Sequence, residues 1–170
     1  MHAHLLLLAR YHAWTFEMLY GALLPLSDAQ YRADCGLFFG SIHSTLNHLL
    51  LADRVWFGRV IGQRYDVPGL DAELETDRHA LEDALHLQTA RWAEWLVAED
   101  GAALNRTLSY SNLAGTRFDN PLVAVLLHVF NHGTHHRGQV SAAISGYGQT
   151  VPEMDLIFYL RGIDQVLPTV

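Results

Sequence analysis

Two histidines four residues apart, His132 and His136, are the side chains of this sequence best placed to bind a metal ion. They lie in an apolar stretch over residues 121–146. In a helix, a step of four residues places them about 40° apart on one face, with Cβ atoms about 5–6 Å apart. Two imidazoles at that spacing can share one ion. With 11 histidines in the chain, such pairs also arise by chance, so a third ligand is needed to support a metal site.

The stretch that carries this pair predicts a long helix over residues 121–146. Its apolar residues recur at intervals of three and four. Asn120 and Pro121 are typical of an N-cap and a first helical position. Gly133 and Gly138 weaken a helix, because glycine lacks a side chain and loses more backbone entropy on folding. Their presence beside the histidines indicates that something approaches the backbone closely, either a ligand or a packing partner.

A third ligand should come from another helix, because sites in helical bundles are built from side chains of facing helices. His128 lies on the face of the pair, but its rise of about 12 Å to His136 is too long for nitrogens ~2.0–2.1 Å from one ion. His135 points about 100° away from His136. His12, which lies among aromatic residues, remains an alternative. His48 is flanked by apolar residues in mid-helix and is the strongest candidate.

The same apolar periodicity predicts three more long helices, at residues 3–24, 38–62 and 71–98. A short helical turn is expected at 28–32. Alternating residues around a polar, glycine-containing centre predict a β-hairpin at 106–119, and a short helix should begin near Met154 and end near Gly162. The predicted fold is all-α: a four-helix bundle with a small hairpin before the fourth long helix and a short C-terminal helix, in one domain over residues 1–170.

The composition excludes several classes of protein. The 170 residues carry 11 Lys and Arg against 18 Asp and Glu, a formal charge of −7, which argues against nucleic-acid binding. Cys35 is the only cysteine, so we expect a reducing, cytoplasmic location and interpret Cys35 as a small buried thiol rather than a nucleophile. The leucines at 5–8 form too short a run to span a membrane and do not indicate a signal peptide.

Two segments of the chain resemble the DinB/YfiT-like superfamily of metalloenzymes. They are Ser44–Trp56, which contains His48, and His128–Gln139, which contains the histidine pair. The likeness extends over essentially the whole chain. It implies metal ligands at His48, His132 and His136, and a bundle of unusual handedness and connectivity that commonly forms a homodimer. Proteins of this superfamily include metal-dependent hydrolases and enzymes that use low-molecular-weight thiols. The family name refers to DNA-damage induction and implies no binding to DNA.

Three imidazole ligands leave at least one coordination position for water or substrate, as in catalytic rather than structural sites. We therefore expect a metal-dependent enzyme that acts on a small molecule, either a hydrolase or a low-molecular-weight-thiol transferase. Imidazole suits several divalent transition metals; zinc is expected on availability, with nickel or iron as alternatives. The metallopeptidase pattern is missing, because no glutamate stands beside the pair. The alternatives are a non-catalytic bundle that binds a metal or small molecule, and a dimeric scaffold without metal.

Two charged residues near these motifs have roles that the sequence leaves open. Asp53 could act as a general base, but it lies about 140° around the helix from His48. Pairing with Arg54 or Arg137 is the expected role of this carboxylate. Arg137 points away from the ligand face, and either binds a substrate carboxylate or pairs with an acid between helices. We favour the structural pairing.

Overall fold

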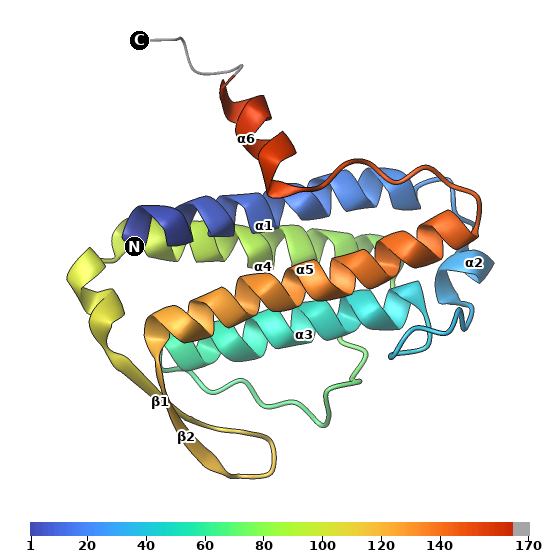
Figure 1. Cartoon of the computed structure of the whole chain (residues 1–170). Helices are drawn as coiled ribbons and strands as arrows, with labels where there is room; N and C mark the ends of the chain where they lie inside the picture. Colours follow the sequence, from blue (N-terminus) through green and yellow to red (C-terminus); the bar gives the residue numbers. More distant parts are fainter. Residues whose placement is uncertain (165–170) are drawn as a thin grey trace.

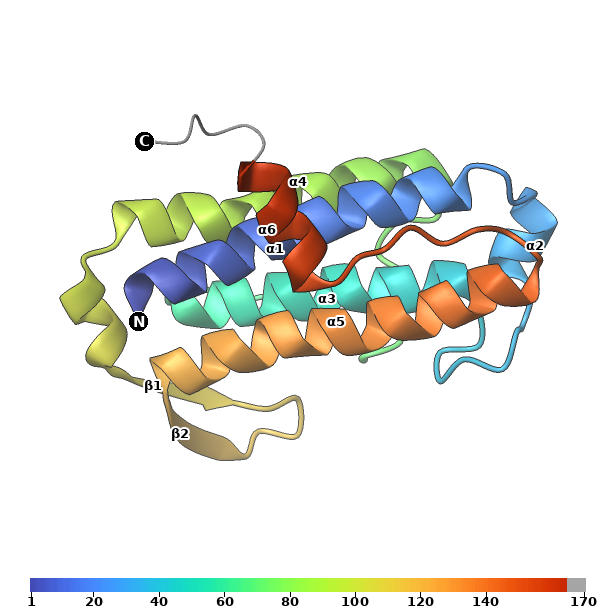
Figure 2. The ribbon, with the colours of Figure 1, turned by 45° about the horizontal axis from the view of Figure 1, so that its top comes forward.

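Four long helices form the centre of the computed structural model, which describes residues 1–164 (Figure 1). They are α1 (His2–Leu23), α3 (Ile42–Val60), α4 (Arg78–Ala98) and α5 (Leu122–Gly146). Helices α1 and α3 each pack against both α4 and α5, which closes the four helices into a bundle (Figure 2). The predicted four-helix bundle is confirmed. None of the helices in this described part of the chain is long and apolar enough to cross a membrane.

Shorter elements lie at the two ends and along one side of the bundle. They are α2 (Asp28–Arg32), the 3-10 helix η1 (Gly101–Asn105), strands β1 (Thr107–Ser111) and β2 (Arg117–Pro121), and α6 (Leu156–Asp164). Helix α6 follows a long strap after α5 and lies over α1, at the top of Figure 1. The hydroxyl of Tyr11 on α1 donates a hydrogen bond to the carbonyl of Met154 in this strap, at 2.6 Å.

The strands β1 and β2 form the predicted hairpin and shift the start of α5 by one residue. They pair antiparallel, with Thr107 opposite Pro121 at one end. Because β2 extends to Pro121, α5 begins at Leu122 rather than at Pro121. Asn120 does not cap the helix as predicted, since its Oδ1 accepts a hydrogen bond from the Tyr110 hydroxyl at 3.0 Å. The side chain that was expected to start a helix instead holds the hairpin together.

In the connection between α3 and α4, the segment just before α4 is held against α3 by the side chain of Asn47. Its Oδ1 accepts hydrogen bonds from the backbone N–H groups of Leu74, at 2.8 Å, and Glu75, at 2.9 Å, and its Nδ2 donates to the Glu75 carbonyl at 3.0 Å. Because these backbone groups already have hydrogen-bond partners, the segment does not need to form a helix to satisfy them. Helix α4 therefore begins only at Arg78, after Asp77 has capped it, and the prediction of helix from residue 71 was wrong.

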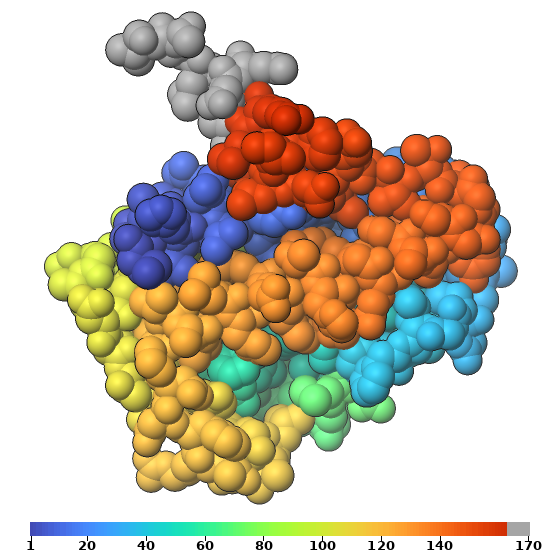
Figure 3. All heavy atoms as spheres, in the orientation of Figure 1, coloured from blue at the N-terminus to red at the C-terminus, as the bar shows by residue number. Residues whose placement is uncertain are grey.

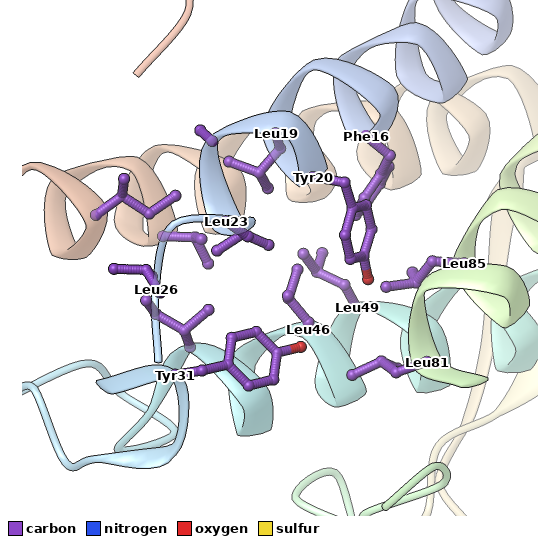
Figure 4. Packing of buried hydrophobic residues seen from close by; sticks show 14 of the residues in the cluster. Phe16, Leu19, Tyr20, Leu23, Leu26, Tyr31, Leu46, Leu49, Leu81 and Leu85 are labelled. Atoms are coloured by element: carbon purple, nitrogen blue, oxygen red, sulfur yellow. The ribbon is translucent and has the colours of Figure 1, made fainter. Parts of the chain in front are cut away.

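Two hydrophobic clusters fill the bundle, and a polar layer separates them. Figure 4 shows the cluster at the α2 end, which includes Phe16 and Leu46. The cluster at the hairpin end includes Phe57 and Trp92. Between them every long helix contributes a buried polar side chain: His12, Asp53, Gln88, Thr89 and Arg137. Burying such groups without partners would be costly, so their contacts determine what this layer can do.

Candidate metal centre

The structure brings His48 of α3 together with His132 and His136 of α5. The Nε2 atoms of His48 and His132 are 3.3 Å apart, and those of His132 and His136 are 3.1 Å apart. The three candidate ligand atoms all lie within 4.8 Å of one another. A tetrahedral ion with metal–nitrogen bonds of ~2.0–2.1 Å holds its nitrogens about 3.3 Å apart. The cluster thus has the size that a single metal ion requires.

Hydrogen bonds on the outer side of two of these rings determine which nitrogen carries the proton. Nδ1 of His48 lies 2.8 Å from the carbonyl oxygen of Leu70, and Nδ1 of His136 lies 2.7 Å from Oε1 of Gln139. Both oxygens can only accept, so Nδ1 is the protonated nitrogen and Nε2 presents a lone pair to the cluster. Outer partners of this kind are typical of metal-binding histidines, because they fix the tautomer and the ring orientation.

Burial keeps the three imidazoles neutral. His48 and His136 are buried and His132 is partly buried. Loss of water lowers the pKa of all three rings, and it lowers the pKa of His132 to about 3 with a further contribution from the neighbouring His136 and His48. A proton on Nε2 of His132 could satisfy only one of the two adjacent lone pairs, whereas a divalent cation satisfies all three. The donor set fits a metal ion.

Two cavities lie beside this cluster, in opposite directions along α3. The cavity nearer the start of α3 has a volume of about 570 Å³ and is lined by Phe38, Phe39, Ser44, Leu70 and Asp71. Phe39 also stacks on the ring of His48, with centroids 3.9 Å apart. The other cavity, of about 300 Å³, includes Trp56 and lies under the hairpin. Because Ser44 precedes His48 and Trp56 follows it, the histidine cluster lies between the two cavities along α3.

The other histidines that were considered as third ligands lie elsewhere. His12 is buried in the polar layer, and His135 is exposed on α5. The ring of His128 lies 5.7 Å from that of His132 and lines the cavity under the hairpin. The structure therefore places His48, rather than His12, with the pair on α5.

A second polar cluster, formed by Asp53, His12 and Arg137, occupies the polar layer. Nη1 of Arg137 donates to Nδ1 of His12 at 2.9 Å, so Nε2 of His12 carries the proton and donates to Oδ2 of Asp53 at 3.0 Å. Burial lowers the pKa of His12 despite the nearby carboxylate, and it lowers the pKa of Arg137 to about 10, which leaves the guanidinium charged at neutral pH. This neutral histidine joins two opposite charges.

This arrangement corrects and completes the sequence-based interpretation of the two charged residues. Asp53 pairs with His12 and not with Arg54 or directly with Arg137. Its exposed fraction is only 4%, and its carboxylate faces His12, so it is not placed as a general base for the histidine cluster. Arg137 takes the structural role favoured from the sequence, through His12.

Gly133 allows the His12 ring to approach α5. A Cβ atom at this position would lie 2.5 Å from Cε1 of His12 and 2.7 Å from Nη1 of Arg137. The close approach predicted from the glycines is therefore made by a packing partner. At Gly138, in contrast, none of the described residues would come within 4 Å of an added Cβ atom, and that glycine has no such role.

The residues that support the three candidate ligands were missed from the sequence. Gln139 stands three residues after His136, a spacing at which helical side chains meet, and this signal could have identified it. Leu70 contributes only a backbone carbonyl, and Phe39 comes from the loop before α3. A residue type or a local spacing gives no indication of contacts like these two.

The fold and the site together define a four-helix bundle with three histidines converging between two of its helices. The DinB family model matches residues 1–165, and the chain belongs to this family. Protein DinB of Bacillus subtilis (strain 168) is 26% identical over 159 residues, which cover 90% of this chain and 91% of that protein.

A solved structure has the same fold at much lower sequence identity. It is that of YfiT from Bacillus subtilis, described as a probable metal-dependent hydrolase with an unusual four-helix bundle topology. The two structures match with a TM-score of 0.61 and 13% identity, over 84% of this chain and 87% of that one. The likeness shows a shared arrangement of helices over most of both chains.

Proposed function

We propose that this protein is a metal-dependent enzyme in which His48, His132 and His136 hold one divalent transition metal, with zinc as the first candidate. The observation that carries the proposal is the convergence of three Nε2 atoms, two of them fixed as lone-pair donors by Leu70 and Gln139. The description of YfiT as a probable metal-dependent hydrolase, on the same fold, supports it.

The proposed reaction is hydrolysis of a small molecule or transfer of a low-molecular-weight thiol to one. When bound, a metal with three imidazole ligands can acidify a water molecule or hold a thiolate at its remaining position. The protein contributes the orientation of the rings, through the Leu70 carbonyl and the Gln139 amide. Phe39 covers one face of the His48 ring and limits the access of water there. Two cavities beside the cluster give room for a substrate, and for a second one in a transfer reaction.

The test begins with the metal content of protein purified without an affinity tag. Inductively coupled plasma mass spectrometry should find about one transition-metal ion per chain. Replacing His48 with Ala should lower the affinity for Zn²⁺ at least about 100-fold, because loss of a ligand exceeds the 10–100-fold loss typical of an outer partner. The matched control is His79→Ala, which removes an exposed histidine of α4 and should leave the affinity unchanged.

Turnover distinguishes an enzyme from a metal-binding module. The metal-loaded protein should hydrolyse an ester or amide, or conjugate a thiol to an electrophile, in a screen of small substrates, and His48→Ala should abolish that activity. Failure of the protein to bind Zn²⁺, Ni²⁺ or Fe²⁺ would contradict the proposal altogether. Metal binding without any turnover would support the alternative, a non-catalytic metal-binding bundle.

A further inference from the structure

We propose that the cavity under the hairpin binds an uncharged aromatic or branched apolar group of the substrate, while the reacting group lies at the histidine cluster. The proposal rests on the proposed function and names its substrate class. The cavity is lined by Trp56, Tyr110, Asn120, Ala124, Val125 and His128.

The walls of this cavity are aromatic and come from three different elements. Trp56 belongs to α3, Tyr110 to β1 and His128 to α5. The Trp56 ring meets those of Tyr110 and His128 edge to face, with centroids 5.0 and 5.3 Å apart. Flat apolar faces held at such angles favour a planar guest, which can continue the same edge-to-face contacts. None of the lining residues named above is an acid, a lysine or an arginine, so the cavity favours a neutral group.

Contacts on the outer side hold these walls in place. The Tyr110 hydroxyl donates to Oδ1 of Asn120 at 3.0 Å, which ties the two strands together at the cavity. The guanidinium of Arg59 lies over both aromatic rings, 4.4 Å from the centroid of Trp56 and 4.8 Å from that of Tyr110. Nη2 of Arg59 also donates to the Ser111 carbonyl at 2.9 Å, which anchors the hairpin to α3. A cavity with fixed walls binds a rigid group at a low cost in entropy.

The cavity lies next to the histidine cluster. His128 lies one helical turn before His132, and their ring centroids are 5.7 Å apart. Figure 3 shows the surface hollowed between the hairpin, α5 and the connection from α3 to α4, with α3 at the bottom of the hollow. A volume of about 300 Å³ is at the lower limit of small-molecule sites, which suits one ring with a short linker. His128, at the boundary, can form a hydrogen bond with a polar atom of that linker.

Hydroxamic acids give a direct test, because the hydroxamate group binds metal ions and the remainder can be varied. We would measure the dissociation constants of acetohydroxamic, phenylacetohydroxamic and 3-phenylpropionohydroxamic acids by calorimetry on the zinc-loaded protein. Burying one aromatic ring should make an aryl compound bind about 10-fold to 100-fold more tightly than acetohydroxamic acid. In Ala124→Leu the added side chain fills the cavity, so this preference should fall to about 1 while acetohydroxamic acid binds as before. Ala142→Leu, the same change at an exposed position of α5, should keep the preference.

Each outcome has a defined meaning. An aryl preference that is absent, or that survives in Ala124→Leu, would overturn the inference and leave the proposed function intact if acetohydroxamic acid still requires the metal. If no hydroxamate binds the zinc-loaded protein, the proposed function fails, and the cavity is then tested with indole on the metal-free protein. Indole should shift the NMR signals of Trp56, Tyr110 and His128 in the wild type and not in Ala124→Leu. Equal shifts in both proteins, or none in either, would overturn the inference independently.

Discussion

Two polar clusters lie near the middle of the bundle, and they differ in how the nitrogens of their histidines are satisfied. In the first, Arg137 donates to His12 and His12 donates to Asp53, so every ring nitrogen meets a group of opposite character. In the second, His48, His132 and His136 turn their Nε2 atoms toward one another at 3.1 and 3.3 Å. The first cluster is complete by itself, whereas the second has the arrangement that a cation would complete.

This difference separates structural from functional polar groups at similar depth. A closed chain of donor and acceptor stabilises the fold and specifies how α1, α3 and α5 meet. Converging lone pairs, in contrast, are unfavourable in the metal-free protein and favourable only toward a ligand. Burial alone does not distinguish the two, since His12 and His48 are both below a tenth exposed. The two kinds of buried histidine are distinguished only by the atoms that their ring nitrogens face.

The largest effect should follow from Asp53→Ala, which removes the carboxylate from the cluster of Asp53, His12 and Arg137. This change leaves the buried Arg137 charge without its carboxylate and the Nε2 proton of His12 without an acceptor, which should lower the free energy of unfolding by about 3–5 kcal/mol. Urea unfolding measures it. Asp83→Ala, at an exposed position of α4, is the control and should change the free energy by less than about 0.5 kcal/mol. A loss below about 1 kcal/mol for Asp53→Ala would show that the cluster is not a closed structural unit.

An intermediate effect should follow from Gly133→Ala. The added Cβ would lie within 2.7 Å of His12 and Arg137, so the network must shift, at a cost of about 1–3 kcal/mol from overpacking that exceeds the gain in helix propensity of about 1 kcal/mol. The same change at Gly138, where no described atom is near, should instead raise the free energy of unfolding by up to about 1 kcal/mol. Thermal and urea unfolding of the two variants should therefore move in opposite directions. Stabilisation by both would contradict the close approach of His12.

The smallest effect is a pH dependence of the free energy of unfolding that arises from the cluster of His48, His132 and His136. The folded-state pKa of His132 is about 3, below the value near 6.5 of an unfolded chain, so the unfolded state binds more protons between these pH values. Stability from this group is complete above pH 6.5 and is lost as the pH falls toward 3. At pH 5 the metal-free protein should have lost about 1 kcal/mol from His132, after a discount for solvent screening.

The variant His132→Leu isolates this contribution. Urea unfolding at pH 7 and pH 5 in the presence of a chelator should show a smaller loss in the variant than in the wild type. His12 is common to both proteins, so its own titration cancels in the difference. Equal losses in the two proteins would mean that burial of the cluster of His48, His132 and His136 does not depress the pKa of His132.

Local patterns in the sequence were sufficient for three of the four long helices, the hairpin and the histidine pair on α5, whereas the choice of His48 also rested on the family resemblance. Periodicity predicted α1, α3 and α5 to within a few residues, and spacing identified the pair on α5. The errors arose where a distant side chain replaced a local signal. Asn47 holds residues 74 and 75 in a loop that has a helix-like composition, and Tyr110 takes the side chain of Asn120 away from the start of α5. The 3-10 helix η1 was not predicted at all.

The partners within the site were unpredictable for the same reason. The Asp53–His12 contact joins residues 41 positions apart, and the His12–Arg137 contact joins residues 125 positions apart. No local pattern could have chosen His12 over Arg54 as the partner of Asp53. Gln139 is the exception, because its bond to His136 follows from helical spacing.

Asn47 and His48 are neighbours on α3, and both bind the connection between α3 and α4. Asn47 binds the backbone of residues 74 and 75, and His48 binds the Leu70 carbonyl. A cation bound at Nε2 would draw electron density from the ring and make the Nδ1 proton of His48 a stronger donor. Occupancy of the proposed metal site and order in that connection would then rise together. By thermodynamic reciprocity, a ligand that orders residues 70–75 would increase the affinity for the cation by the same factor. Amide hydrogen exchange across this segment would therefore report on the occupancy of the proposed metal site.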